Sequence, residues 1–313
     1  MSEREQSAPV IEAGSAAGGA GTPSARKRVG VVGAGTMGAG IATTVVRAGH
    51  SVVVYDLDDD RVGRGLDVVR RFLDKSVEKG KLAPAVRDQS FDNLHGATEL
   101  DALGGCDIVV EAIFEDLGLK QELLSRLDDV VSPDALLHTN TSTLSVTAIA
   151  AGSRHPERVV GTHYCNPAPL MKLVELVRGR MTADAPLEKT RRFLEGLDKR
   201  AVLCADVPGF IVNRFLIPFE NDCIRALEAG MGTVESIDRA IRFGLGYPMG
   251  TFQLLDIVGL DIHRAVSLSL YEQLRDPRFA PPPLVDRMIS AGHLGRKVGR
   301  GFYTYDQAGL LGT

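Results

Sequence analysis

A histidine and a glutamate in the segment GTHYCNPAPLMKLVELV, residues 161–177, are the side chains best placed by their types to do chemistry. His163 ends one run of β-forming residues and Glu175 lies within the next, with the turn NPAPLM between them. If the two runs pair as neighbouring strands, the carboxylate can hold one imidazole nitrogen while the other nitrogen takes a proton from an alcohol. The spacing fits two structural polar residues equally well, so it leaves both interpretations open.

A glycine-rich turn near residue 33 indicates where a nucleotide could bind. The β-rich run RVGVVG leads into GAGTMGAG, which places Gly33, Gly35 and Gly38 in G-x-G-x-x-G spacing between an expected strand and an expected helix. The first glycine permits a tight turn, the second lets backbone amides approach a pyrophosphate, and the third lets the helix pack on the strand. The sequence therefore predicts a dinucleotide site, with Thr36 and Met37 among its contacts.

An acid at the end of the next β-run completes this nucleotide motif. Asp56 follows SVVVY, 18 residues after Gly38, where its carboxylate can accept hydrogen bonds from the hydroxyls of an adenosine ribose. An acid in this place repels a 2′-phosphate, which favours NAD over NADP. Arg61 lies only five residues further on, so the sequence does not secure that preference.

Two later β-runs also end in polar residues. CDIVVEAIFED carries Glu111 and Glu115, with Lys120 on the helix expected to follow, and the run after it ends in HTNTSTLSV, which contains Ser142. Ligands of open α/β sheets lie beyond the carboxyl ends of the strands, so contact with a cofactor or a substrate oxygen fits these positions. Surface charges at strand ends and hydroxyls that cap the next helix fit them as well.

The order of apolar patterns predicts two structural parts. From Arg28 onward β-rich runs alternate with helical stretches, which is typical of a Rossmann-type, doubly wound parallel sheet in the α/β class. After Pro208 the pattern is helical, as in GFIVNRFLIPFENDCIRALEAG. We expect a cofactor-binding domain at residues 28–206 and an all-α domain at 207–313. The Ala-, Gly- and Ser-rich residues 1–27 are predicted to be a disordered tail.

Composition argues against several other classes of protein. A net charge of −4 and the lack of tryptophan speak against nucleic-acid binding. No apolar run approaches the roughly 20 residues of a membrane-spanning helix, and no signal peptide is evident, so a cytoplasmic location away from membranes is expected. The four cysteines are scattered along the chain, which suggests free thiols and no metal site.

Taken in order, several motifs make the sequence similar to the L-3-hydroxyacyl-CoA dehydrogenases, also called 3-hydroxybutyryl-CoA dehydrogenases, from about Arg28 to Asp306. These motifs are the glycine turn, VVEAIFED, NTSTLS, H-x-x-N-P-x-P-x-M-K-L-V-E, DVPGFIVNR, FGLGYPMG, LLDIVGLD and LGRKVGRGFYTYD. The resemblance implies an NAD-dependent enzyme that oxidises a 3-hydroxyacyl thioester to the 3-ketoacyl thioester, or catalyses the reverse reduction. By matching the motif H-x-x-N-P-x-P-x-M-K-L-V-E, the resemblance implies that His163 is the general base in the oxidation and that Glu175 orients it.

The resemblance implies further site residues. Ser142 and Asn213 would contact the reacting oxygens of the substrate, and Asn166 would help to shape the same site. Around the cofactor, the matched positions that join the glycine turn and Asp56 are Glu115, Lys120, Ser142, Asn166 and Lys297. The helical domain of the family dimerises and closes over the cleft, so a homodimer is expected.

The substrate is less sharply implied than the reaction. Where the family commonly has two aromatic residues after the histidine, this chain has Tyr164 and Cys165, and Thr251 and Gln253 replace Pro and Glu of another motif. The predicted helix at 61–81 has a local excess of basic residues, which fits contact with CoA, docking of an acidic acyl carrier protein as in polyketide extender-unit pathways, or a solvated surface. A dehydrogenase for free 3-hydroxy acids is a further alternative, although such enzymes usually employ a lysine in place of the His-Glu pair. A non-catalytic relative is another, but it would be expected to have lost part of the site.

Overall fold

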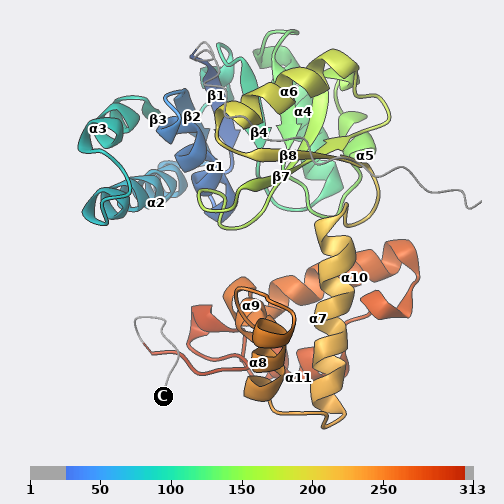
Figure 1. Cartoon of the computed structure of the whole chain (residues 1–313). Coiled ribbons are helices and arrows are strands. Elements are labelled where there is room, and N and C mark those ends of the chain that lie inside the picture. Colours follow the sequence, from blue (N-terminus) through green and yellow to red (C-terminus); the bar gives the residue numbers. More distant parts are fainter. Residues whose placement is uncertain (1–25, 307–313) are drawn as a thin grey trace, which may run out of the picture.

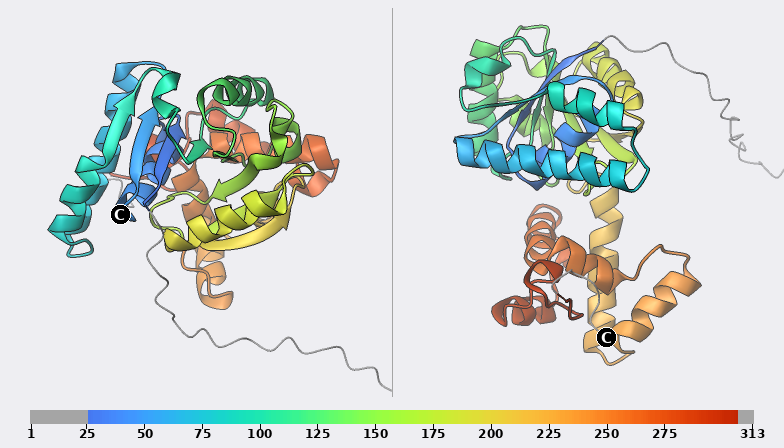
Figure 2. Two further views of the ribbon diagram at one scale, coloured as in Figure 1. Left: turned by 90° about the horizontal axis from the view of Figure 1, so that it is seen from above. Right: turned by 90° about the vertical axis from the view of Figure 1, so that its left-hand side faces the viewer.

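The computed structural model of the chain describes residues 26–306 and has two parts. Figure 1 shows a layered α/β part and, below it, a group of helices that α7 (Val212–Glu228) joins to the sheet. The side view in Figure 2 shows the same arrangement, with α7 running from the edge of the α/β part into the helical part. The tail predicted at residues 1–27 falls outside the described residues except for its last two, and so do residues 307–313.

The α/β part is built on one eight-stranded sheet with the strand order β3-β2-β1-β4-β5-β6-β7-β8. In chain order the strands are β1 Arg28–Val32, β2 Ser51–Tyr55, β3 Leu94–Ala97, β4 Ile108–Glu111, β5 Leu136–Thr139, β6 Val159–Tyr164, β7 Leu173–Arg178 and β8 Arg200–Ala205. All neighbouring strands are parallel except β6 and β7, which are antiparallel. The chain reverses its direction of progress across the sheet between β1 and β4, which is where ligands of such folds bind. The expected Rossmann-type sheet is thus confirmed.

Helices cover both faces of this sheet. They are α1 Thr36–Arg47, α2 Asp59–Glu78, α3 Pro84–Asp92, α4 Leu117–Val130, α5 Val146–Ala150 and α6 Asp184–Gly196. One apolar core packs α1, α2 and α6 on the sheet, and a second packs α4 and α5 on the opposite face. Because successive side chains of a strand point to opposite faces, Val52 and Val54 belong to the first core and Val53 and Tyr55 to the second. The near-continuous apolar runs of the central strands follow from burial on both faces.

The two strands at the edges of the sheet were not expected from the sequence. In β3, LHGA, His95 is exposed and Gly96 has no side chain to pack, while most residues of β8, RAVLCA, remain accessible to solvent. An edge strand pairs on one side only and buries less apolar surface, so its pattern is weaker than that of a central strand.

The second part of the structure is helical. After α7 it contains α8 Val234–Gly244, α9 Thr251–Val258, α10 Leu260–Leu274 and α11 Pro283–Ser290. Its core is formed by apolar side chains of all five helices, among them Ile224, Ile241, Phe252, Leu260 and Val285. Within residues 26–306, no helix combines the length and the apolar character needed to cross a membrane.

A short linker with two unusual backbone conformations connects the parts. Gly209 and Phe210 have φ angles of 78° and 45°, and a positive φ at a non-glycine residue such as Phe210 is uncommon. On the sheet side of the linker, the Asp206 carboxylate accepts hydrogen bonds from the amides of Val146 and Thr147 at 2.9 and 2.8 Å. The linker is therefore anchored to the first turn of α5 before it turns into α7.

The close packing of the glycine turn predicts unequal effects of two alanine substitutions. A Cβ atom added at Gly38 would lie 1.7 Å from the carbonyl oxygen of Gly33, whereas one added at Gly35 would meet nothing within 4 Å. We expect Gly38→Ala to lower the free energy of unfolding, measured with urea, by about 1–3 kcal/mol because the turn must shift. Gly35→Ala is the matched control and should cost less than about 1 kcal/mol. Equal losses in the two variants would contradict this account of the turn.

Candidate active site

A cleft of about 980 Å³ lies beyond the carboxyl ends of β1, β2, β4 and β5. One wall is the glycine turn with Asp56, and another consists of the loops that follow β4 and β5. The helical part closes the cleft with side chains of α10, namely Ile262, Ala265, Val266 and Ser269. The cleft thus lies between the two parts of the structure, at the position where the strand order reverses.

The glycine turn has the shape that a dinucleotide requires. Gly33 has a φ of 101°, and a Cβ atom there would lie 2.6 Å from the carbonyl oxygen of Ala112, so a larger residue would not fit. Gly35 precedes α1 and is open above its Cα, which leaves room for a phosphate to approach the first amides of the helix. Thr36 and Met37 begin α1 and line the cleft. These features fit NAD, the cofactor expected from the sequence.

Asp56 is tied to the glycine turn. One carboxylate oxygen accepts a hydrogen bond from the Ala34 amide at 2.8 Å, and the other accepts one from the Leu57 amide at 2.8 Å. Asp56 therefore lies at the cleft wall where the motif predicts ribose contact.

The histidine and glutamate of the segment at residues 161–177 are in contact. In the antiparallel pair β6 and β7, His163 lies directly opposite Glu175, and His163 Nδ1 is 2.6 Å from Glu175 Oε2. Both side chains are buried, Glu175 almost completely. The two runs of β-forming residues thus pair as neighbouring strands.

The second oxygen of Glu175 binds the start of the helical part. Glu175 Oε1 accepts hydrogen bonds from the amides of Ile211 and Val212 at 2.8 and 2.9 Å. Burial raises the pKa of Glu175, but the hydrogen bonds from His163 and from these amides outweigh that effect, so the pKa lies below its usual value. The carboxylate is ionised and can hold a proton on Nδ1 of His163, which leaves Nε2 as the acceptor.

Ser142 connects the histidine to the cleft. Its hydroxyl lies 3.1 Å from His163 Nε2, and Ser142 itself lines the cleft. The ring of Phe210 packs against the imidazole, tilted, with 5.7 Å between ring centroids. The imidazole is therefore fixed by Glu175, Ser142 and Phe210 together.

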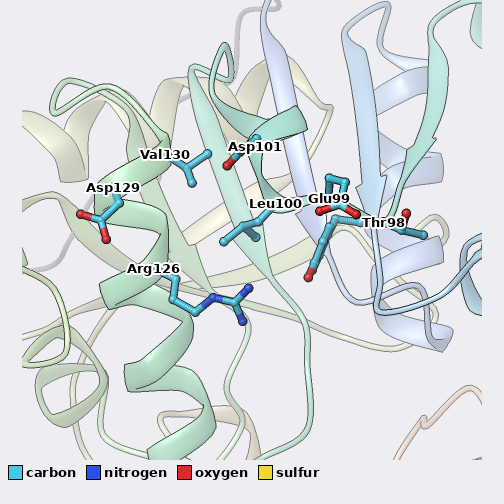
Figure 3. A pocket seen from close by; sticks show the side chains of 8 residues that line it. Thr98, Glu99, Leu100, Asp101, Arg126, Asp129 and Val130 are labelled. Carbon is cyan, nitrogen blue, oxygen red and sulfur yellow. The ribbon is translucent and has the colours of Figure 1, made fainter.

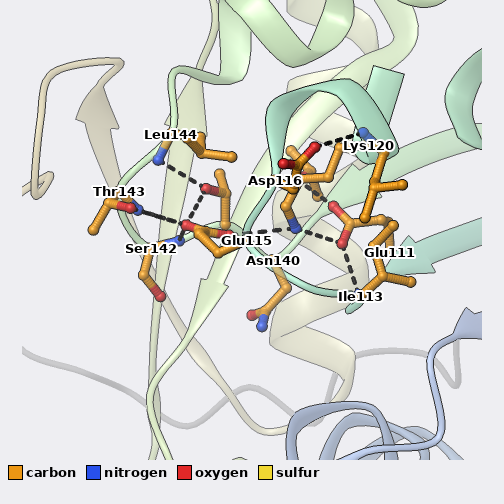
Figure 4. Close-up of polar contacts among 12 residues, drawn as sticks. Glu111, Ile113, Glu115, Asp116, Lys120, Asn140, Ser142, Thr143 and Leu144 are labelled. Carbon is orange, nitrogen blue, oxygen red and sulfur yellow. Dashed lines mark hydrogen bonds and ion pairs between the residues drawn. The ribbon is translucent and has the colours of Figure 1, made fainter. Parts of the chain in front are cut away.

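A network of charges holds the loop that carries Ser142 (Figure 4). Glu115 Oε1 accepts hydrogen bonds from the amides of Ser142 and Thr143 at 2.7 and 2.8 Å, and from the Thr141 hydroxyl at 2.7 Å. Burial raises the pKa of Glu115, but Lys120 and these donors lower it further than burial raises it. In the structure Glu115 thus fixes the Ser142 loop while it also lines the cleft.

Lys120 lies behind this loop. Its ammonium group is 2.6 Å from Glu111 Oε1 and 3.4 Å from Glu115 Oε2, and its side chain is only 1% exposed. The second oxygen of Glu111 accepts a hydrogen bond from the Thr139 hydroxyl at 2.6 Å. The structure therefore gives Lys120 and Glu111 the role of supporting Glu115, and neither is among the residues that line the cleft.

Within residues 26–306, three other residues implied by the resemblance form no hydrogen bond with His163 and do not belong to the cleft lining. Asn213 is half-buried in the first turn of α7, two residues after Ile211, and within residues 26–306 it has no hydrogen bond to the His163 group. Asn166 is exposed and precedes a cis bond to Pro167. Lys297 forms an ion pair with Asp261 at 2.6 Å, next to the cleft-lining stretch of α10.

The two residues that follow His163 have different surroundings. Tyr164 is buried in the core under α1 and α6, on the face of the sheet opposite to His163, because side chains alternate along β6. It therefore cannot contact a substrate at the imidazole. Cys165 is partly exposed beyond the end of the strand, and burial, with a contribution from Glu175, raises the pKa of its thiol to about 11. At neutral pH this thiol is protonated and a poor nucleophile.

A smaller hollow of about 310 Å³ adjoins the cleft (Figure 3). Its lining is polar and consists of Tyr55, Thr98, Glu99, Leu100, Asp101, Arg126, Asp129 and Val130. Tyr55 and Arg126 also line the main cleft, so the hollow extends the Asp56 end of the cleft. None of the His163 group belongs to it.

Some of these contacts have no signal in the sequence pattern. The amides of Ile211 and Val212 are backbone groups, so no residue type marks them, although they lie within the quoted motif DVPGFIVNR. The pairing of Lys120 with Glu111 brings a strand and a helix together through side chains whose directions the sequence does not define.

Comparison with known proteins agrees with this geometry. Residues 28–207 match the 3-hydroxyacyl-CoA dehydrogenase, NAD binding domain family, and residues 209–305 match the C-terminal domain family of the same enzymes. The chain is 42% identical over 281 residues to a 3-hydroxybutyryl-CoA dehydrogenase of Mycobacterium tuberculosis, covering 89% of this chain and 98% of the relative. It is 40% identical to a 3-hydroxybutyryl-CoA dehydrogenase of Bradyrhizobium diazoefficiens, with 89% and 95% covered.

Solved structures give the same result for the fold. The crystal structure of M. tuberculosis FadB2 superposes with a TM-score of 0.88 at 42% identity, covering 90% of this chain and 100% of that chain. The (S)-3-hydroxybutyryl-CoA dehydrogenase PaaH1 from Ralstonia eutropha gives 0.85 at 38% identity, with the same coverage. With both of its domains matched and its cleft built for a dinucleotide, the chain belongs to the 3-hydroxyacyl-CoA dehydrogenase family and is an oxidoreductase that uses NAD.

Proposed function

We propose that the protein interconverts a short 3-hydroxyacyl-CoA, of the 3-hydroxybutyryl type, and its 3-ketoacyl-CoA, with His163 as general base. The observation that carries the proposal is the hydrogen-bonded series Ser142–His163–Glu175, which begins at the wall of the cleft and ends at a buried carboxylate. The names of the relatives given above support the acyl group.

In the oxidation, the substrate hydroxyl gives its proton to His163 Nε2. The imidazolium that forms is stabilised by the Glu175 carboxylate, which already holds Nδ1 at 2.6 Å. NAD, when bound, supplies the acceptor for the hydride that leaves the carbon bearing this hydroxyl. In the reduction, His163 returns its proton to the developing alkoxide, so the same pair serves both directions.

The substrate oxygens require donors close to Nε2 of His163. The Ser142 hydroxyl is 3.1 Å from that atom and can donate to a hydroxyl or carbonyl oxygen in the same place. We propose the same task for Asn213, whose position in the first turn of α7 is two residues from the amide that binds Glu175. Cofactor roles for Lys120, Asn166 and Lys297 stay predictions, because the first is buried and the other two do not line the cleft.

An acyl carrier protein is a second candidate for the carrier of the thioester. The basic residues in and after α2 are all exposed, and the first two also line the cleft: Arg61, Arg64, Arg70, Arg71, Lys75, Lys79 and Lys81. This surface fits the phosphates of CoA, and it also fits an acidic acyl carrier protein, because both are anionic. We favour CoA, since the named substrates of the relatives are CoA thioesters.

We further propose that residues 28–206 form the cofactor domain and residues 207–313 a helical domain for substrate closure and dimerisation. The last strand ends at Ala205 and α7 begins at Val212, which supports this division. Large apolar side chains are exposed in the helical part, among them Phe215, Phe243 and Leu245, each more than 60% accessible. Exposed apolar groups of this kind favour a homodimer. A cytoplasmic location stays a prediction.

The activity can be tested with a panel of substrates. With NADH, we expect acetoacetyl-CoA to be reduced with a kcat/KM at least about tenfold above that of the same acyl group on an acyl carrier protein, and with no turnover of free acetoacetate. The measurement is the loss of NADH absorbance, with mass spectrometry of the product. Preference for the carrier-protein thioester would replace CoA by the second candidate, and activity on the free acid alone would overturn the thioester proposal.

The base assignment can be tested by substitution. We expect His163→Ala to lower kcat by about 10²–10⁴-fold, because the proton then has no positioned acceptor, while NADH binding measured by calorimetry is unchanged. His95→Ala, on the exposed edge strand β3, is the matched control and should retain full activity. Turnover of His163→Ala at the wild-type rate would show that another group is the base.

The homodimer predicts a mass twice the 33.6 kDa of one chain in light scattering after size-exclusion chromatography. Phe243→Glu places a charge at a side chain that is 75% exposed on α8, and we expect it to shift the population toward monomer. Val68→Glu, an apolar-to-acid change on α2 in the other part, should leave the dimer intact. A wild-type mass of one chain would rule the dimer out.

A further inference from the structure

Three arginines line the end of the cleft beside Asp56, and the proton chemistry at His163 uses none of them. Arg61 and Arg64 belong to α2, and Arg126 reaches from α4 into the adjoining hollow (Figure 3). Arg61 and Arg64 are three residues apart, so they lie on the same side of their helix. Arginines therefore face this end of the cleft from two different helices, and the carboxylates of Glu99, Asp101 and Asp129 line the adjoining hollow beside Arg126.

The three arginines differ in how far their charges are already paired. Arg61 Nη1 is 3.6 Å from Asp56 Oδ1, and its Nε is 3.2 Å from Asp58 Oδ2. Within residues 26–306, Arg64 and Arg126 form no ion pair with a carboxylate. The site thus has cationic groups available for an anion of the ligand.

The negative charge of Asp56 is correspondingly offset. Its two oxygens accept hydrogen bonds from the amides of Ala34 and Leu57, and the Arg61 guanidinium is close to one of them. A bare carboxylate in this position discriminates against NADP because it repels a 2′-phosphate. Here that repulsion is weakened by an adjacent guanidinium, which is also the side chain that binds phosphate best through its planar pair of donors.

We propose that the cleft accepts NADP(H) as well as NAD(H), with Arg61 as the residue that binds the 2′-phosphate of the adenosine ribose. A ribose whose hydroxyls bind Asp56 has its 2′-oxygen beside that carboxylate and hence beside the Arg61 guanidinium. Arg64 and Arg126 add positive charge around the same position. When the phosphate is absent, Arg61 remains paired with Asp56 and Asp58, so NAD(H) binds without an unpaired cation at the site. The proposal rests on the dehydrogenase function only for its turnover readout.

The test measures binding of the full chain to NAD⁺, NADP⁺, ADP-ribose and 2′-phospho-ADP-ribose by calorimetry, since the chain has no tryptophan to report binding by fluorescence. For the wild type we expect Kd for NADP⁺ within about tenfold of that for NAD⁺, and a steeper loss of NADP⁺ affinity with added salt. Arg61→Ala should weaken NADP⁺ and 2′-phospho-ADP-ribose by about tenfold or more, and NAD⁺ and ADP-ribose by less than about twofold. Arg61→Lys retains the charge but loses the paired donors, so its affinities for NADP⁺ and 2′-phospho-ADP-ribose should lie between those of the wild type and of Arg61→Ala.

Arg70→Ala is the matched control, because Arg70 is exposed on the same helix but does not line the cleft, and it should change none of the four affinities. The proposal is overturned if wild-type NADP⁺ binds more than about tenfold weaker than NAD⁺, or if Arg61→Ala weakens both cofactors equally. In either case, persistent reduction of acetoacetyl-CoA by NADH would show that the proposed function stands while the NADP site does not. If NADP⁺ binding were intact but that reduction failed, the NADP site would stand while the proposed function would not.

Discussion

The buried carboxylate of Glu175 is the interaction on which the two parts of the structure depend. One oxygen holds His163, and the other binds the amides of Ile211 and Val212 at the start of α7. A carboxylate that is 1% exposed requires such a set of donors, because a buried charge without hydrogen bonds would not recover the free energy that it loses on leaving water. The orientation of the imidazole and the attachment of the helical part are therefore one physical constraint.

The linker strengthens this connection. Asp206 anchors it to the first turn of α5, and a few residues later Phe210, with its positive φ, places its ring on the imidazole. A residue in this conformation persists only where its surroundings hold it, and here the ring is also packed in a small core with Val146 and Val177. A movement of α7 relative to the sheet would consequently disturb the hydrogen bonds of Glu175 and the packing of His163 together.

Much of this arrangement could be predicted from the sequence, because it depends on local patterns. The glycine turn follows from its spacing, and the central strands follow from their near-continuous apolar runs. The spacing of His163 and Glu175 alone fits two interpretations, and the family resemblance is what favours their pairing. The edge strands β3 and β8 could not be found in this way, since they bury little apolar surface. The locations of Lys120 and Lys297 could not be found either, because a lysine side chain can reach an acid in several directions, and only the folded chain selects Glu111 for one and Asp261 for the other.

The departures from the family pattern after His163 can be separated on the same grounds. Tyr164 points to the opposite face of the sheet, where it fills the core below α1, so its identity concerns packing rather than the substrate. Cys165 follows the strand and is partly exposed, and because burial raises the pKa of its thiol to about 11, the thiol stays protonated at neutral pH and is a poor nucleophile. Any effect of Cys165 on the substrate must therefore act through its size. A thiol is smaller than an aromatic ring, and the proton path through His163 and Glu175 does not involve it.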